Sequence, residues 1–154
     1  MANALTHIAP LKPGANVKGL QETLFKSKAA VDHALKETGT VHDFRFVVFD
    51  GSSPNLLPHA DSKGPFFLGV ITTYDGSFEA YIQDFVRFLA PVFDALLPNT
   101  TDGAHLVPVK DNVEGLIEWV RKDDAAQHPP NSEFRFYTAY PYTVQQILAA
   151  DIKE

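Results

Sequence analysis

The stretch VHDFRFVVFD, residues 41–50, decides the fold of this chain. It is rich in β-branched and aromatic residues and too short for a helix of this composition, so it predicts a β-strand. Successive side chains of a strand point to opposite faces of the sheet. Phe44, Phe46 and Val48 therefore share one face, while Val47 and Phe49 share the other. Both faces of this strand are apolar.

A second stretch, PFFLGVITT at residues 65–73, predicts another strand with two apolar faces. Its two sets of side chains are Phe66, Leu68 and Val70 on one face, and Phe67 and Ile71 on the other. An antiparallel sheet that carries helices on one side only normally alternates apolar and polar residues. We therefore expect a cover for the second face, and the sheet of a second copy would supply it by closing a shared α+β barrel. The alternative is that a helix inserted within residues 98–132 and the long loop at residues 51–64 cover this face within one chain.

Periodicity and turn signals place the first elements. Residues 4–11 predict a strand that ends in the turn signal Pro–Leu–Lys–Pro–Gly. Apolar residues recur at helical spacing over residues 16–37, and Gly39 follows as a helix stop.

The second half of the chain predicts three helices and one more strand. Ser77 caps a long helix, in which Pro91 predicts a kink or a restart. Asp111 and Glu114 resemble a capping box that opens a shorter helix. The sequence then predicts a polar loop at residues 123–132, a last strand at 134–140 and a terminal helix at 144–152.

In chain order these elements give β-α-β-β-α, an inserted helix and a final strand, which is the split βαβ pattern of ferredoxin-like folds. We expect one α+β domain over residues 1–154, with an inserted segment at about 98–132. The predicted architecture is a ferredoxin-like antiparallel sheet with two long helices and an inserted helix, assembled as a dimeric α+β barrel.

Composition excludes several classes of function. Apolar residues make up 45% of the chain, which is too many for a disordered protein. A net charge of −6 and scattered Lys and Arg argue against a nucleic-acid partner. Without Cys there is no disulfide framework, thiolate nucleophile or Cys-based metal site. Neither a signal peptide nor an apolar run of the ~18 residues that a membrane span needs is present, so we expect no membrane partner and a cytoplasmic location.

The candidate catalytic residues are His42, Arg45, Tyr74 and Asp75. His42 and Arg45 are three positions apart on one strand, an odd separation, so they point to opposite faces unless a bulge intervenes. Arg45 shares a face with Asp43, with which it would form an ion pair or anchor a substrate carboxylate. Tyr74 and Asp75 lie at a corner between strand and helix, where Asp75 is either a turn residue or an acid.

An aromatic cavity with a few polar groups is the usual form of a small-molecule site. We expect such a ligand pocket to be lined by Phe44, Phe46, Phe66, Leu68, Phe136 and Tyr140, although aromatic clusters also build dimer interfaces. His7 lies on the first strand and either faces this cavity or is a satisfied core residue. No two histidines have metal-ligand spacing, so no metal site is predicted.

Several motifs resemble a group of poorly characterised dimeric α+β-barrel proteins. The matching stretches are VHDFRF at residues 41–46, TYDGSF at 73–78 with Tyr81 and Asp84 downstream, and the tail FY at 136–137 with VQQI at 144–147. More distantly the chain is similar to dye-decolourising peroxidases, chlorite-dismutase-like haem proteins and cofactor-free monooxygenases. The G-x-x-D-G motif of the peroxidases is altered here, because Thr72 stands at its first glycine. Tyr142 and Thr143 stand where related tails often have Gly-Arg-Ser, so both changes argue against a peroxidase mechanism.

We expect a homodimer that binds a small apolar or aromatic molecule in the barrel, either as a binding protein or as a cofactor-free enzyme. His42, Arg45 and Tyr74 would be its polar contacts. One alternative is a haem-binding, peroxidase-like protein in which His7 or His42 is the axial ligand. The other is a non-enzymatic structural or stress-related dimer.

Overall fold

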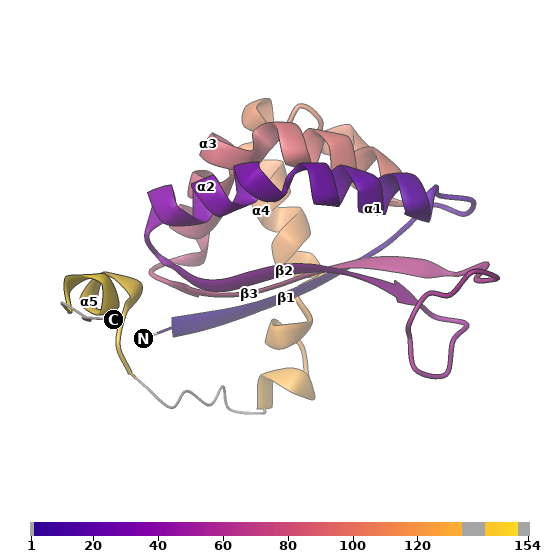
Figure 1. Ribbon diagram of the computed structural model, residues 1–154. Coiled ribbons are helices and arrows are strands. Elements are labelled where there is room, and N and C mark those ends of the chain that lie inside the picture. Colours follow the sequence, from indigo (N-terminus) through magenta and orange to yellow (C-terminus); the bar gives the residue numbers. More distant parts are fainter. Residues whose placement is uncertain (1, 134–140, 151–154) are drawn as a thin grey trace.

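A three-stranded antiparallel sheet forms the base of the protein (Figure 1). The computed structural model describes residues 2–133 and 141–150. The strands are β1 (Ala2–Pro10), β2 (Val41–Asp50) and β3 (Phe66–Asp75), in the order β1-β3-β2 across the sheet. The predicted α+β class is confirmed. The strand predicted at residues 134–140 lies outside the described residues.

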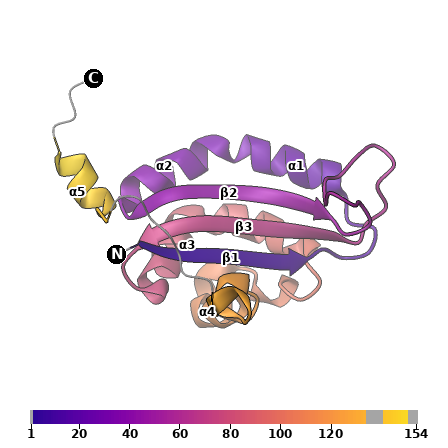
Figure 2. The same ribbon diagram turned by 90° about the horizontal axis from the view of Figure 1, so that it is seen from below.

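Helices lie over one face of this sheet, beside one edge and at one end. They are α1 (Val17–Lys26), α2 (Lys28–Thr38), α3 (Phe78–Leu96), α4 (Val113–Lys122) and α5 (Val144–Ala149), with short 3-10 turns between them. Figures 1 and 2 show α1, α2 and α3 above the sheet, α4 beside the β1 edge, and α5 at the end of the sheet where the chain begins. No helix in the described part of the chain is long and apolar enough to cross a membrane.

The prediction of a single helix at residues 16–37 is wrong in one respect. The structure has two helices there, α1 and α2, which are divided at Ser27. The hydroxyl of Thr23 donates to the carbonyl of Gly19 at 2.9 Å, and that of Ser27 donates to the carbonyl of Thr23 at 2.8 Å. Such bonds from a side chain to the preceding turn bend or interrupt helices. The predicted stop at Gly39 is confirmed, since it ends α2 with a positive φ of 58°.

Two expectations about the later helices are also corrected. Helix α3 neither ends nor restarts at Pro91 but continues to Leu96, because buried side chains on both sides of the proline hold it against the core. The capping box at Asp111 does not form. Asp111 belongs to a separate 3-10 turn, and α4 begins after Asn112, whose amide instead donates to the carbonyl of Pro108.

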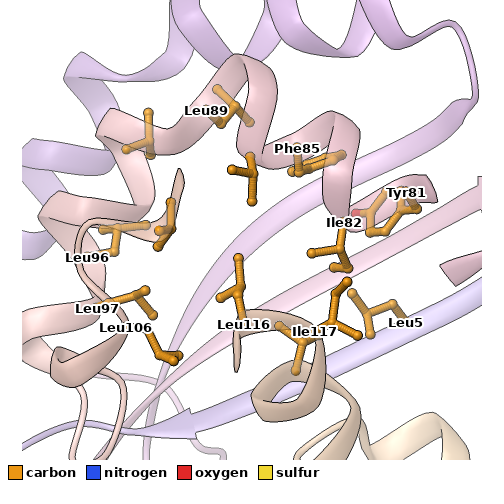
Figure 3. Close-up of a cluster of buried hydrophobic side chains, with 14 of the residues drawn as sticks. Leu5, Tyr81, Ile82, Phe85, Leu89, Leu96, Leu97, Leu106, Leu116 and Ile117 are labelled. Carbon is orange, nitrogen blue, oxygen red and sulfur yellow. The ribbon is translucent and has the colours of Figure 1, made fainter. Parts of the chain in front are cut away.

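The core lies between the sheet and α3 and α4. The largest side chains with essentially no exposed surface include Leu89, Leu96 and Leu116. Figure 3 shows leucine, isoleucine and aromatic side chains of α3 together with Leu116 and Ile117 of α4 and Leu5 of β1. The core-facing sheet residues are Leu5, His7, Ala9, Leu68, Thr72 and Tyr74, which are buried, with Phe44, Phe46 and Val48 packed against them.

The opposite face of the sheet is apolar over part of its area, and we call it the open face. Strand alternation places on it Ala4, Thr6, Ile8 and Pro10 of β1, Asp43, Arg45, Val47 and Phe49 of β2, and Phe67, Gly69, Ile71 and Thr73 of β3. Figure 2 looks onto this face, and no described helix crosses the strands. Ile8, Val47, Phe49, Phe67 and Ile71 are accordingly only partly buried.

Replacing Leu89 with alanine should destabilise the protein by about 2–5 kcal/mol, because the side chain is completely buried and its removal leaves a cavity. The free energy of unfolding in urea measures the effect. Phe25→Ala is the control, since the Phe25 side chain is 80% exposed and its loss should change stability by no more than about 0.5 kcal/mol. Equal effects of the two substitutions would contradict this core.

Candidate functional site

A β-bulge lies at His42. Val41 pairs with Tyr74 and Asp43 pairs with Thr73, so His42 is an extra residue in β2 with no partner of its own. In a regular strand Val41 and Asp43 would face the same side of the sheet. With the bulge between them, Val41 is buried in the core and Asp43 is exposed on the open face. It therefore allows His42 and Arg45 to lie on the same face, which simple strand parity forbids.

The His42 ring meets the Asp75 carboxylate at the end of the open face. Nε2 of His42 lies 3.2 Å from Oδ1 of Asp75, with the two side chains 20% and 11% exposed. The contact lacks the alignment of a hydrogen bond, and neither atom has another hydrogen-bond partner among the described residues. A carboxylate at this position favours the tautomer that carries its proton on Nε2. That tautomer leaves Nδ1 as the acceptor of the ring.

The second oxygen of Asp75 holds the C-terminal helix. Oδ2 of Asp75 accepts the backbone N–H of Val144 at 2.7 Å. Burial acts to raise the pKa of Asp75, but the N–H of Val144 and the His42 ring outweigh it and lower the pKa below its usual value. The amide of Gln145 adds a hydrogen bond of 2.7 Å to the carbonyl of Gly39. Asp75 therefore acts as a junction between β2, β3 and α5, while the cap of α3 is Ser77.

Arg45 stands apart from this pair. It is exposed and pairs across the sheet with Ile71, four residues before Asp75 on β3. At ~3.3 Å per strand residue, Arg45 therefore lies about 13 Å along the sheet from Asp75. Asp43 is exposed as well and makes no ion pair with Arg45 in the described part of the chain. The structure thus joins His42 to Asp75 but leaves Arg45 further along the same face.

Tyr74 faces the opposite way, towards the helices. It is only 4% exposed, and its ring stacks on that of Tyr81 with the centroids 4.1 Å apart. Burial, with further contributions from Asp124 and Glu79, raises the pKa of Tyr74 to about 12. Tyr74 and Asp75 are neighbours in sequence but belong to different sites, because they lie on opposite faces of β3.

Tyr74 lines a pocket that we call the end pocket. It has a volume of about 460 Å³ and lies where β1 begins and β3 ends, beside the start of α3 and the turn after α4. Its walls are Asn3, Ala4, Tyr74, Gly76, Ser77, Phe78, Arg121, Asp124 and Gln127. Sequence reasoning missed Arg121 and Asp124 because no motif marks them, and Asp124 lies in a stretch that predicts only a polar loop.

His7 is buried in the core rather than facing a barrel. It is 2% exposed, its ring lies 4.3 Å from that of Trp119, and Nδ1 is 3.3 Å from the carbonyl oxygen of Val120. Nε2 has no partner among the described residues. Burial lowers the pKa of His7, and the nearby Val120 carbonyl and acidic side chains only partly offset this.

His7 borders an apolar cavity of about 40 Å³ between the sheet and the helices. Phe44, Phe46 and Leu68 of the predicted ligand pocket also line it, whereas Phe66 packs against the core elsewhere. Phe136 and Tyr140 lie outside the described residues. Since one water occupies ~30 Å³ of liquid, the cavity is far too small for haem or an aromatic ligand. Any haem would need another site.

No cluster of three or more His, Asp or Glu residues able to hold a metal ion occurs within residues 2–133 and 141–150. Comparison of the chain with protein-family models, curated proteins and solved structures finds no match. The resemblance to dimeric α+β-barrel and haem proteins therefore stays a prediction from sequence motifs.

The stability of the protein should fall as the pH falls below about 6.5, because His7 is held neutral in the folded state and protonates first in the unfolded state. Its contribution is complete above the unfolded pKa of 6.5 and is lost towards the lowered folded pKa. Urea unfolding between about pH 8 and pH 5 measures the slope, which His7→Leu should reduce. His105→Gln, at an exposed position, is the control. The same slope in wild type and His7→Leu would contradict the assignment.

Proposed function

We propose that the protein is a homodimer that binds a small apolar or aromatic molecule over the open face of its sheet, between the two copies. The observation that carries this proposal is the composition of that face. Val47, Phe49, Phe67 and Ile71 make one part apolar, whereas His42 and Asp75 lie at one end. A chain that leaves such a face to water loses the free energy of burying it, ~25 cal/mol per Å².

Two sheets packed face to face lie about 10 Å apart, and their side chains normally fill the space between them. Small residues would leave room for a ligand. Gly69 is central on β3, and the ring of Phe49 already leans over it, so that a Cβ at Gly69 would lie 2.8 Å from that ring. Rotation of Phe49 would open space directly above the strand.

His42 would be the polar contact at the end of this space. With Asp75 orienting Nε2, Nδ1 can accept a hydrogen bond or a proton from a ligand hydroxyl. Arg45 lies between His42 and the apolar part of the face and would pair with an acidic substituent of the ligand. This arrangement suits a phenol or an aromatic acid, and it is compatible with cofactor-free proton abstraction.

The dimer is tested by placing a charge on the open face. Ile71→Asp should convert a dimer into a folded monomer, because the carboxylate would be buried without a partner in the interface. Light scattering after gel filtration at micromolar concentration measures the mass, and far-ultraviolet circular dichroism reports folding. Gln83→Asp adds the same charge at an exposed site on α3 and should leave the dimer intact. A monomeric wild type would contradict the proposal.

Ligand binding is tested with 2-naphthol, a fluorescent phenol. The wild type should bind it, and His42→Gln should weaken binding by about fivefold, the effect of one lost hydrogen bond. His33→Gln, on the exposed side of α2, should bind like the wild type. Titration with haem tests the alternative function. A Soret band that is lost on replacing one histidine would favour a haem protein instead. Binding of neither compound would favour a structural dimer.

A further inference from the structure

The end pocket lies at the start of β1, between Tyr74 on the helix side of the sheet and Ala4 at the margin of the open face, and it contains polar groups that the proposed function does not use. Its volume of about 460 Å³ falls within the range of small-molecule sites, ~300–1,000 Å³. Two of its polar side chains are almost completely buried, since Tyr74 is 4% exposed and Asp124 is 2% exposed. Polar groups at such depth are costly unless they have partners.

Asp124 uses one of its two oxygens for the fold. Oδ1 accepts the backbone N–H of Thr6 at 2.9 Å and that of Ala126 at 3.0 Å, which ties the edge of β1 to the turn after α4. Oδ2 accepts no hydrogen bond from the described residues, and no described cation lies within ion-pair distance of Asp124. Within residues 2–133 and 141–150, the second oxygen of this buried carboxylate therefore has no partner and is the candidate contact for a ligand.

The other charges around the pocket cancel each other. Arg121 forms an ion pair with Glu79 at the rim, where both side chains are about half exposed. The same guanidinium lies 5.1 Å from the centroid of the Phe78 ring, so this wall already accepts a cation. With Arg121 paired to Glu79, Asp124 leaves the pocket with an excess of one negative charge. Glu79 also offsets the positive end of the α3 dipole.

Two aromatic residues are among the remaining walls of the pocket. Phe78 presents one ring, and Tyr74 presents another, fixed by its stacking on Tyr81. A carboxylate beside aromatic faces is the arrangement that recognises organic ammonium groups, because both the charge and the ring quadrupoles attract a cation.

We propose that the end pocket binds a small organic amine, whose ammonium group donates to Oδ2 of Asp124 and whose apolar part packs against Tyr74 and Phe78. The proposal does not rest on the dimer or on a ligand of the open face, since the contacts it uses come from Asp124, Tyr74 and Phe78.

Three probes of equal size separate the contributions of charge and shape. Benzylamine should shift the backbone amide signals of Tyr74, Gly76 and Ser77 in two-dimensional NMR spectra of the full chain. Benzyl alcohol should bind at least about tenfold more weakly, since it lacks the charge-assisted hydrogen bond, and benzoate should not bind. No shift with benzylamine, or equal shifts with all three probes, would overturn the proposal.

Two variants then locate the ammonium group. Asp124→Asn keeps an oxygen acceptor for the backbone N–H groups of Thr6 and Ala126 but removes the charge. It should weaken the binding of benzylamine by at least about tenfold. Glu118→Gln removes one charge from an exposed site on α4 and should leave the affinity unchanged. Unchanged affinity in Asp124→Asn would overturn the assignment, and the comparison of probes on the wild type remains decisive should that variant fail to fold.

Discussion

The rest of the structure depends on the central position of β3. This strand pairs with β1 on one side and with β2 on the other, so every backbone hydrogen bond of the sheet involves it. Its alternating side chains consequently define two surfaces, one under the helices and one open. Leu68, Thr72 and Tyr74 anchor the core, while Phe67 and Ile71 lie on the open face. A one-residue slip of this strand would exchange the two sets.

The end of β3 also explains why two candidate sites lie so close together in sequence and yet are separate. Tyr74 and Asp75 are consecutive, and the pleat sends them to opposite faces. Tyr74 therefore joins the pocket formed with α3 and the turn after α4, whereas Asp75 meets His42 and the start of α5. A single strand end thus supplies one polar side chain to each site, Tyr74 to the end pocket and Asp75 to the contact with His42.

Much of the fold could be read from the sequence. Residues 41–50 form the predicted strand to the residue, and Ser77 and Gly39 act as the predicted cap and stop, because these signals depend on local backbone chemistry. The departures arise where several local preferences compete. Thr23 and Ser27 compete with the helix for its own carbonyls, and at Pro91 the packing of α3 against the core outweighs the preference to end a helix.

The sequence by itself determined the α+β class, the three strands of the described sheet and the apolar side chains on both faces of β2 and β3, since side-chain alternation and periodicity are properties of the chain alone. It also identified His42, Tyr74 and Asp75 as unusual. The tertiary structure alone decided which of them meet. A bulge at His42 changes the alternation of β2, and its position depends on the register with β3 rather than on any residue type. Asp124 reaches Thr6 and the end pocket across more than a hundred residues, and no local pattern encodes such a contact.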